Sequence, residues 1–157
     1  MIALYPGSFD PIHLGHVDTV EQAASLFGEV VVAVIHNPEK SSGLFSIDER
    51  VAIAKAALAH VRGVRVEAFA GLAINAAALV HANFIVKSAR NAGDFEIEQQ
   101  MANTNYSVSG IRTVVMIALP GNSFISSRYI REIAVHGGDV STLVPVNVNA
   151  AIRAKHK

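Results

Sequence analysis

Residues 5–16 read Tyr5-Pro6-Gly7-Ser8-Phe9-Asp10-Pro11-Ile12-His13-Leu14-Gly15-His16. The apolar run at residues 2–5 predicts a buried strand, and the prolines and glycines after it predict a shaped loop before a helical pattern begins near Leu14. Open α/β sheets build their ligand crevices from strand, loop and helix in this order. The glycines suggest a close approach of the backbone to another group, and a helix start offers unpaired N–H groups to an anion. The stretch therefore indicates a phosphate site.

The length and the cysteine content narrow the class of protein. At 157 residues the chain fits a single domain, residues 1–157, and is long enough to bury a core without cross-links. It has no cysteine, which excludes disulfides, thiolate catalysis and zinc sites built on thiolates. About five apolar residues precede Pro6, too few for a signal peptide or a membrane span, so we expect a cytoplasmic protein.

The balance of charged residues limits the kinds of partner that the chain is expected to bind. With 13 basic and 13 acidic residues, no global field draws the chain to nucleic acid or to an anionic membrane, and any phosphate binding must be local. Charged residues make up 17% of the chain, against a typical value of about 25%. This leaves less polar surface than a lone monomer usually carries, which favours a homo-oligomer.

Strand and helix patterns alternate along the chain. A continuous β-branched run such as residues 30–35 is typical of a strand buried on both faces of a parallel sheet. The alternation predicts an α/β fold: a single doubly wound Rossmann-like domain with a five-stranded parallel sheet and helices on both faces. Strands are expected at 2–5, 30–35, 64–69, 84–87 and 113–119, and helices at 14–27, 47–60, 72–80, 94–106, 127–135 and after Pro145.

Capping residues support these boundaries. Gly28 is expected to end the first helix, and Ser46 with Glu49 forms a capping box for the second. Asp94 is expected to cap the fourth helix, after a polar loop at 88–93, and Ser126 or Ser127 the fifth. Asp139 is expected to start a short helical turn.

Parallel strands place all strand-to-helix loops at one edge of the sheet, so polar residues far apart in the chain converge there. Neither the dinucleotide pattern G-x-G-x-x-G nor a Walker sequence occurs, so phosphates would be held by side chains and helix starts. The converging residues predict a basic, serine-lined crevice: Ser8, His13, His16, Lys40, Lys87, Arg90 and residues 123–128.

Two motifs resemble a known superfamily. His13-Leu14-Gly15-His16 fits the (T/H)-x-G-H signature of nucleotidyltransferases, and Ile125-Ser126-Ser127-Arg128-Tyr129-Ile130-Arg131 resembles their I-S-S-T-x-x-R signature. Over nearly the whole chain the resemblance narrows to the bacterial phosphopantetheine adenylyltransferase family. Blocks similar to those of that family occur in its order: Pro6-Gly7-Ser8-Phe9-Asp10-Pro11, Asn37-Pro38-Glu39-Lys40, Asp48-Glu49-Arg50, Asp94-Phe95-Glu96-Ile97-Glu98 and Ser123-Phe124-Ile125-Ser126-Ser127.

The resemblance implies a reaction and its partners. An enzyme of this family transfers AMP from ATP to 4′-phosphopantetheine, giving dephospho-coenzyme A and pyrophosphate. Mg²⁺ is expected on the ATP phosphates rather than on a protein metal site. The resemblance further implies a hexamer, and coenzyme A as a feedback ligand.

The resemblance also implies site residues. His16 would be the catalytic group that stabilises charge on the α-phosphate, with His13 beside it. An unperturbed histidine titrates near pH ~6.5, so nearby phosphate is expected to favour the cationic form. The substrate-binding residues would be Ser8, Lys40, Leu72, Ala73 and Lys87, and the ATP-binding residues Ser8, Phe9, His16, Ser88, Ala89, Arg90, Glu98, Asn122, Ser123, Phe124, Ile125, Ser126, Ser127 and Arg128.

Two alternatives stay open. The chain could act on another phosphate acceptor, such as nicotinamide mononucleotide or glycerol phosphate, although Lys40, Lys87 and the Asp94 block argue against it. It could also be a nucleotide or coenzyme A binder without activity. Ser88 stands where the family usually has glycine, and Arg128 where a serine or threonine is common. Asn122 replaces a frequent aromatic residue.

Overall fold

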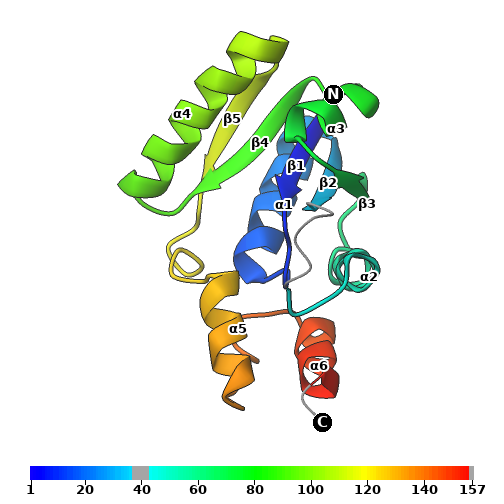
Figure 1. Ribbon diagram of the computed structural model, residues 1–157, viewed down its shortest axis with the longest axis vertical. Helices are drawn as coiled ribbons and strands as arrows, with labels where there is room; N and C mark the ends of the chain where they lie inside the picture. Colours follow the sequence, from blue (N-terminus) through cyan, green and yellow to red (C-terminus); the bar gives the residue numbers. More distant parts are fainter. Residues whose placement is uncertain (37–42, 156–157) are drawn as a thin grey trace.

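Strands and helices alternate through the computed structural model, which describes residues 1–36 and 43–155 (Figure 1). The predicted elements are all present, with most ends within two or three residues of the expected ones. In chain order they are β1 (Ile2–Gly7), α1 (Leu14–Phe27), β2 (Glu29–His36), α2 (Ile47–Ala57), β3 (Val64–Ala70), α3 (Ala73–Leu79), β4 (Phe84–Ala89), α4 (Ala92–Ser109), β5 (Arg112–Ile117), α5 (Ser127–Val135) and α6 (Val146–Lys155).

The five strands form one parallel sheet in the order β3-β2-β1-β4-β5, which confirms the predicted fold class. The chain builds outward from β1 to β3 and then crosses back to β4 on the other side of β1. The direction in which successive strands are added to the sheet therefore reverses between β1 and β4. In open α/β sheets the ligand crevice lies at this switch point, beyond the carboxyl ends of the strands.

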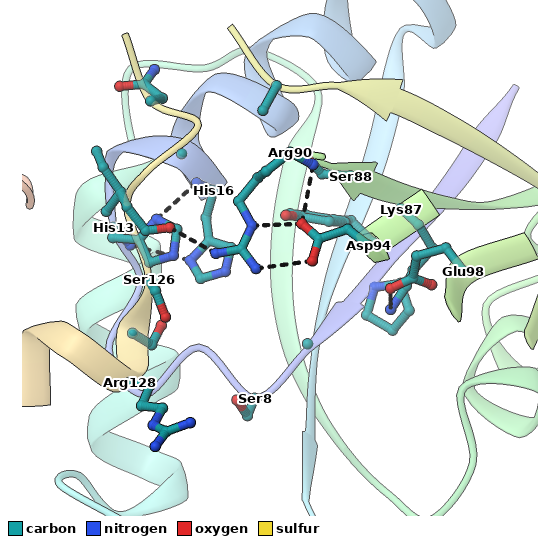
Figure 2. A pocket seen from close by; sticks show the side chains of 18 of the residues that line it. Ser8, His13, His16, Lys87, Ser88, Arg90, Asp94, Glu98, Ser126 and Arg128 are labelled. Atoms are coloured by element: carbon teal, nitrogen blue, oxygen red, sulfur yellow. Dashed lines mark hydrogen bonds and ion pairs between the residues drawn. The ribbon is translucent and has the colours of Figure 1, made fainter. Parts of the chain in front are cut away.

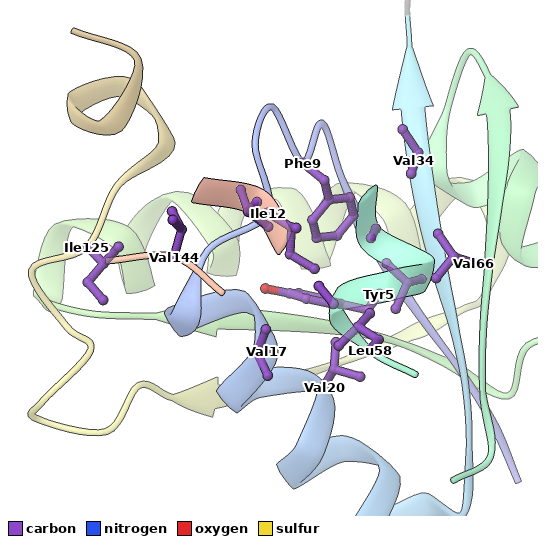
Figure 3. Packing of buried hydrophobic residues seen from close by; sticks show 14 of the residues in the cluster. Tyr5, Phe9, Ile12, Val17, Val20, Val34, Leu58, Val66, Ile125 and Val144 are labelled. Carbon is purple, nitrogen blue, oxygen red and sulfur yellow. The ribbon is translucent and has the colours of Figure 1, made fainter. Parts of the chain in front are cut away.

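Side chains of the central strands alternate between two cores, as the period of two in a strand requires. Tyr5 and Val32 belong to the larger core, with residues of α1, α2, α5 and α6 (Figure 3). Leu4 and Val31 point to the opposite face, where α3 covers the sheet. Helices on both faces explain why the central strands consist almost wholly of apolar residues.

Local signals set several helix ends. Gly28 follows α1 with φ 86°, a conformation that costs glycine little. The Ser46–Glu49 capping box forms at the start of α2 with both hydrogen bonds present. Among the described residues, no helix combines the length and the apolar content needed to cross a bilayer.

Two local predictions are wrong. The polar loop expected at 88–93 is shorter, because β4 continues to Ala89 and α4 begins at Ala92. Asn91 caps this helix in place of Asp94: its Oδ1 accepts from the N–H of Asp94 at 2.9 Å, while the Asp94 side chain turns to Arg90. The short turn expected after Asp139 is present: Asp139 Oδ1 accepts from the N–H of Ser141 at 3.0 Å, and the N–H of Leu143 donates to the carbonyl of Val140 at 2.9 Å.

Candidate active site

A cavity of about 400 Å³ opens at the switch point, beyond the carboxyl ends of β1 and β4 (Figure 2). Its volume lies within the usual range for small-molecule sites. The walls come from the loop after β1, the start of α1, the end of β4, the α4 helix and the β5–α5 segment. The lining residues are Tyr5, Pro6, Gly7, Ser8, His13, Gly15, His16, Lys87, Ser88, Arg90, Asp94, Ile97, Glu98, Ala118, Asn122, Ile125, Ser126, Ser127, Arg128 and Arg131.

Asp10 anchors the loop after β1. Its buried carboxylate accepts from the backbone N–H groups of Leu44 and Phe45, both at 2.9 Å. The Arg50 guanidinium lies 3.3 Å from the same carboxylate and donates to the carbonyl of Ser8. A buried carboxylate is stable only with such partners, so the loop is fixed to the segment that leads into α2.

The start of α5 holds the same loop from the other side. Ser127 Oγ donates to the carbonyl of Pro11 at 2.8 Å, and Arg131 Nη1 donates to the carbonyl of Asp10 at 2.6 Å. Two residues of the second signature therefore bind the backbone of the loop after β1. Ser126 occupies the N-cap position, and its side chain makes no capping hydrogen bond.

Gly7 and Gly15, in the stretch of residues 5–16, make room for rings of the protein itself. A Cβ at Gly7 would lie 3.0 Å from the Phe9 ring, and one at Gly15 would lie 3.1 Å from the His13 ring. The close approach expected from these glycines is thus to Phe9 and His13. Gly7 and Gly15 shape the loop and the helix start around these two side chains.

His13 and His16 cap the first turn of α1 reciprocally. The His16 N–H donates to His13 Nδ1 at 3.3 Å, and the His13 N–H donates to His16 Nδ1 at 3.2 Å. The two rings stack with their centroids 3.6 Å apart and their planes at 20°. This is the geometry of a capping box, with imidazole nitrogens in the place of the usual oxygens.

Burial favours the neutral form of both rings. Burial lowers the pKa of His13 to about 4, with a further contribution from Arg90. Burial also lowers the pKa of His16 well below its usual value, helped by His13, Arg90 and Lys87. Burial thus favours imidazole, whereas a phosphate beside the rings is expected to favour imidazolium.

Two ion pairs cross from the end of β4 to α4. Lys87 Nζ lies 3.1 Å from Glu98 Oε1, and Arg90 Nε lies 2.7 Å from Asp94 Oδ2 (Figure 2). The hydrogen bond to Arg90 lowers the pKa of Asp94. Arg90 Nη1 also donates to the carbonyl of Ile125 at 3.1 Å, so this guanidinium joins β4, α4 and the β5–α5 segment.

Most of the predicted residues meet in the cavity. The predicted residues that line it are Ser8, His16, Lys87, Ser88, Arg90, Glu98, Asn122, Ile125, Ser126, Ser127 and Arg128. The Phe9 side chain is 2% exposed and packs in the core, so only its backbone can meet a ligand. Lys40 lies outside the described residues.

The other predicted residues lie away from the cavity lining. Ala89 is buried, and Phe124 is exposed. Ser123 Oγ donates to the carbonyl of Pro120. Leu72 and Ala73 follow β3, the edge strand, which β2 separates from β1.

Asp94, Arg50 and Arg131 have structural roles in the site that the sequence reasoning did not assign. The ion pair of Asp94 with Arg90 could have been predicted, because the two residues lie four positions apart in the sequence. No local pattern pairs Arg50 with Asp10, because 40 residues separate them and only the fold brings them together. Arg131 belongs to the second signature, and its partner is a backbone carbonyl that no sequence pattern marks.

The carboxylates that line the cavity are the side chains that could hold a magnesium ion. Asp94 and Glu98 are both paired with cations, and no cluster of three metal-ligating side chains occurs within residues 1–36 and 43–155. Glu98 Oε2 is buried with no hydrogen-bond partner in the described part of the chain. These residues fit a cation carried mainly by substrate oxygens and water, with Glu98 Oε2 as the oxygen left to hold it.

The arrangement suits phosphate chemistry without a covalent enzyme intermediate. Lys87, Arg90 and Arg128 supply positive charge, and the first turn of α5 adds backbone N–H groups. The neutral imidazoles can donate hydrogen bonds where charge develops. The site is built to position a polyphosphate and stabilise a transition state.

Known proteins resemble this chain over most of its length. The model of the cytidylyltransferase-like family matches residues 4–133. The phosphopantetheine adenylyltransferase of Thermosynechococcus vestitus (strain NIES-2133 / IAM M-273 / BP-1) is 45% identical over 155 residues, which cover 98% of this chain and 92% of that protein. The phosphopantetheine adenylyltransferase of Synechococcus sp. (strain CC9311) is 47% identical over 149 residues, 94% of this chain and 92% of that protein.

Proposed function

The chain belongs to the cytidylyltransferase-like family and, within it, to the phosphopantetheine adenylyltransferases, and on that premise we propose that it transfers AMP from ATP to 4′-phosphopantetheine. The products are dephospho-coenzyme A and pyrophosphate, in coenzyme A biosynthesis. The observation that carries this proposal is the His16 ring at the switch-point cavity, between the basic end of β4 and the start of α5.

The reaction needs positioning and charge stabilisation. An oxygen of the phosphopantetheine phosphate forms a bond to the α-phosphorus of ATP, and the bond from that phosphorus to the bridging oxygen of pyrophosphate breaks. The electron pair of the broken bond leaves with pyrophosphate. His16 would donate a hydrogen bond to the α-phosphate as negative charge builds on it. Ser8, at the end of β1, would align the attacking phosphate.

The ion pairs at the end of β4 would respond to ligand. Lys87 is paired with Glu98 in the structure and would turn to the phosphate of phosphopantetheine. The Arg90 guanidinium makes three hydrogen bonds within the protein, two to Asp94 and one to Ile125, so we assign Arg90 mainly to holding the nucleotide segment in place. Leu72, Ala73 and Lys40 would contact the acceptor further from the reacting atoms.

Magnesium would enter with ATP. When bound, it neutralises phosphate charge and makes pyrophosphate a better leaving group. Glu98 Oε2 would hold a water of the hydrated ion. Glu98 would thus hold the hydrated ion through Oε2, and its Oε1 would be released when Lys87 turns to the acceptor phosphate.

A pyrophosphate-release assay tests the proposed function. The purified protein is given ATP, Mg²⁺ and one acceptor at a time: 4′-phosphopantetheine, nicotinamide mononucleotide or glycerol phosphate. We expect release only with phosphopantetheine, and release at least about a hundredfold slower from the His16→Ala variant. Release with only one of the other acceptors would show that this acceptor, and not phosphopantetheine, is the substrate. No release with any acceptor, together with retained ATP binding, would favour a binder without activity.

We further propose that the protein works as a homo-oligomer, and specifically as a hexamer. Helix α4 has 18 residues and none of them is buried. Its half-buried positions, Asp94, Glu98, Ala102 and Asn105, are mostly polar. Its large apolar residues face solvent instead, as do two at the end of β5: Phe95, Ile97, Met101, Tyr106, Val108, Ile117 and Leu119. An exposed apolar surface of this kind fits a contact with further copies of the chain.

Two further expectations belong to the same proposal. A cysteine-free chain is compatible with the reducing cytoplasm, where we place the reaction. Coenzyme A shares the phosphopantetheine arm of the acceptor, so it would compete for the same site as a feedback ligand. Inhibition by coenzyme A that phosphopantetheine relieves is the expected result.

A further inference from the structure

The reciprocal cap of α1 fixes which nitrogen of each ring faces the backbone. His16 Nδ1 lies 3.2 Å from the N–H of His13, and His13 Nδ1 lies 3.3 Å from the N–H of His16. A backbone N–H can only donate, so each Nδ1 must be an acceptor without a proton. A neutral imidazole carries one proton, which is therefore on Nε2 in both rings.

Protonation of His16 would break this arrangement. Imidazolium has a proton on both nitrogens, so the Nδ1 proton of His16 would point at the N–H of His13. The stacked His13 ring, 3.6 Å away, would lose its own cap in the same way if it took a proton. Both pKa values lie below the usual range of histidine, as this geometry requires.

We propose that His13 is a positioning residue that fixes His16 as a neutral imidazole with its proton on Nε2, so that His16 meets the α-phosphate as a neutral hydrogen-bond donor. This inference rests on the proposed function for the identity of the phosphate. The assignment of the proton rests on the capping geometry alone. On this proposal a fixed neutral donor would take the place of the cationic form expected from the sequence.

The surroundings of the pair favour the same state. Gly15 leaves room for the His13 ring, since a Cβ there would lie 3.1 Å from that ring. The rings of Tyr5 and Phe9 meet the His16 ring edge to face, with centroids 6.3 Å and 5.0 Å away. The charged and titratable side chains that share the cavity with the pair are Tyr5, Lys87, Arg90, Asp94, Glu98, Arg128 and Arg131. The positive charges of Arg90 and Lys87 oppose protonation of His16.

Nitrogen NMR of the full chain tests the proton assignment directly. Long-range proton–nitrogen spectra of ¹⁵N-labelled protein at pH 7 distinguish an unprotonated Nδ1 from a protonated one, and the signals of His16 are assigned by their loss in His16→Ala. We expect an unprotonated Nδ1 and a protonated Nε2, both without ligand and with a non-hydrolysable ATP analogue and Mg²⁺. A proton on Nδ1 of His16 in either sample would overturn the proposal.

Two substitutions of His13 test its role through catalysis. Asparagine is a good N-cap residue whose oxygen can take the place of Nδ1, whereas alanine cannot cap. We expect kcat of His13→Ala to fall about 10- to 100-fold, with ATP affinity changed less than about threefold, because a displaced His16 donor affects mainly the transition state. His13→Asn should keep kcat within about threefold of the wild type. Equal kcat values in the two variants would contradict a capping role.

The pH profile separates the two forms of His16. A neutral donor keeps kcat constant as the pH rises from about 6 to about 8, whereas a required imidazolium would lose activity through that range. A wild-type profile that falls through pH ~6.5 would overturn the proposal. Absence of pyrophosphate release with every acceptor would count against the proposed function only, because the NMR result for His16 needs no turnover.

Discussion

The His16 side chain depends on its neighbours for its position and its charge. Tyr5 and Phe9 close off one side of the ring, and His13 stacks on another. The helix backbone fixes Nδ1, so the free edge of the ring carries Nε2. A hydrogen-bond donor held this way needs little reorganisation when charge develops on a phosphate, which is the condition for effective electrostatic catalysis.

Loss of the His16 ring should affect turnover far more than binding. We expect His16→Ala to lower kcat at least about a hundredfold, by analogy with removal of one transition-state donor, while the Kd for ATP changes little. Steady-state kinetics and calorimetric ATP titration measure the two quantities. His60→Ala, at an exposed position, serves as the matched control. Near-normal turnover of His16→Ala would refute a catalytic role.

Arg128 allows a test of whether the nucleotide pocket differs from that of its relatives. Its side chain lines the cavity at the start of α5, and Ser8 lines the same cavity (Figure 2). If it contacts the triphosphate, Arg128→Ser should weaken ATP binding about 5- to 100-fold, the usual effect of losing a charge-assisted hydrogen bond. Titration with ATP and Mg²⁺ measures this. Unchanged affinity would show that the guanidinium makes no contact with ATP.

At the scale of elements, the site depends on contacts between segments remote in sequence. The start of α5 holds the loop after β1 through Ser127 and Arg131. Arg90 links the end of β4 to both α4 and the carbonyl of Ile125. The walls of the cavity are therefore coupled, and a change in one segment is expected to move the side chains of another.

The capping box at the start of α1 should make stability depend on pH. The pKa of His13 is about 4 in the folded protein and about 6.5 when unfolded, so the unfolded state binds more protons between these values. Stability is then full above about pH 6.5 and falls as the pH drops toward about 4, by up to ~1.4 kcal/mol per pH unit for one histidine. Urea unfolding at several pH values measures the slope.

Substitution at the cap identifies the source of this slope. His13→Asn keeps the cap but removes the titrating group, so its stability should fall less steeply below pH ~6.5 than that of the wild type. Parallel curves for His13→Asn and the wild type would show that His13 does not contribute.

At the scale of the whole molecule, the large uncovered surface is that of α4 and the end of β5. The helix lies against β4 and β5 at one side of the sheet (Figure 1). Met101 and Val108 lie seven residues apart on one side of α4 and are 48% and 65% exposed. A charge at this surface should oppose assembly, because it would be buried without a partner in an interface.

We therefore expect Met101→Asp to shift the protein toward smaller species. Light scattering coupled to size-exclusion chromatography gives the mass of the wild type and the variant at equal concentration. The wild type should run as a multiple of the 16.7 kDa chain, up to six copies. Lys55→Asp on α2 is the matched control and should leave the mass unchanged. A wild type that is monomeric would refute the proposed oligomer.

Much of the fold could be predicted from the order of local patterns. The limits of α1 were predicted correctly from its apolar spacing and Gly28, and the Ser46–Glu49 box from four consecutive residues. Errors arose where a side chain had two possible partners. Asp94 could cap a helix by sequence, and in the structure it pairs with Arg90 while Asn91 caps instead.

The sequence by itself determined the alternating elements, the location of the site at the carboxyl edge of the sheet and its serine and basic residues, because these depend on local patterns and on the rules of parallel sheets. The tertiary structure alone decided the burial and the capping partner of His16 and the partners of Asp10, Arg90 and Arg131. Desolvation and contacts between distant segments set these, and neither is encoded in a local pattern. The first motif thus marked the site, and the folded environment determined the chemistry available to its histidines.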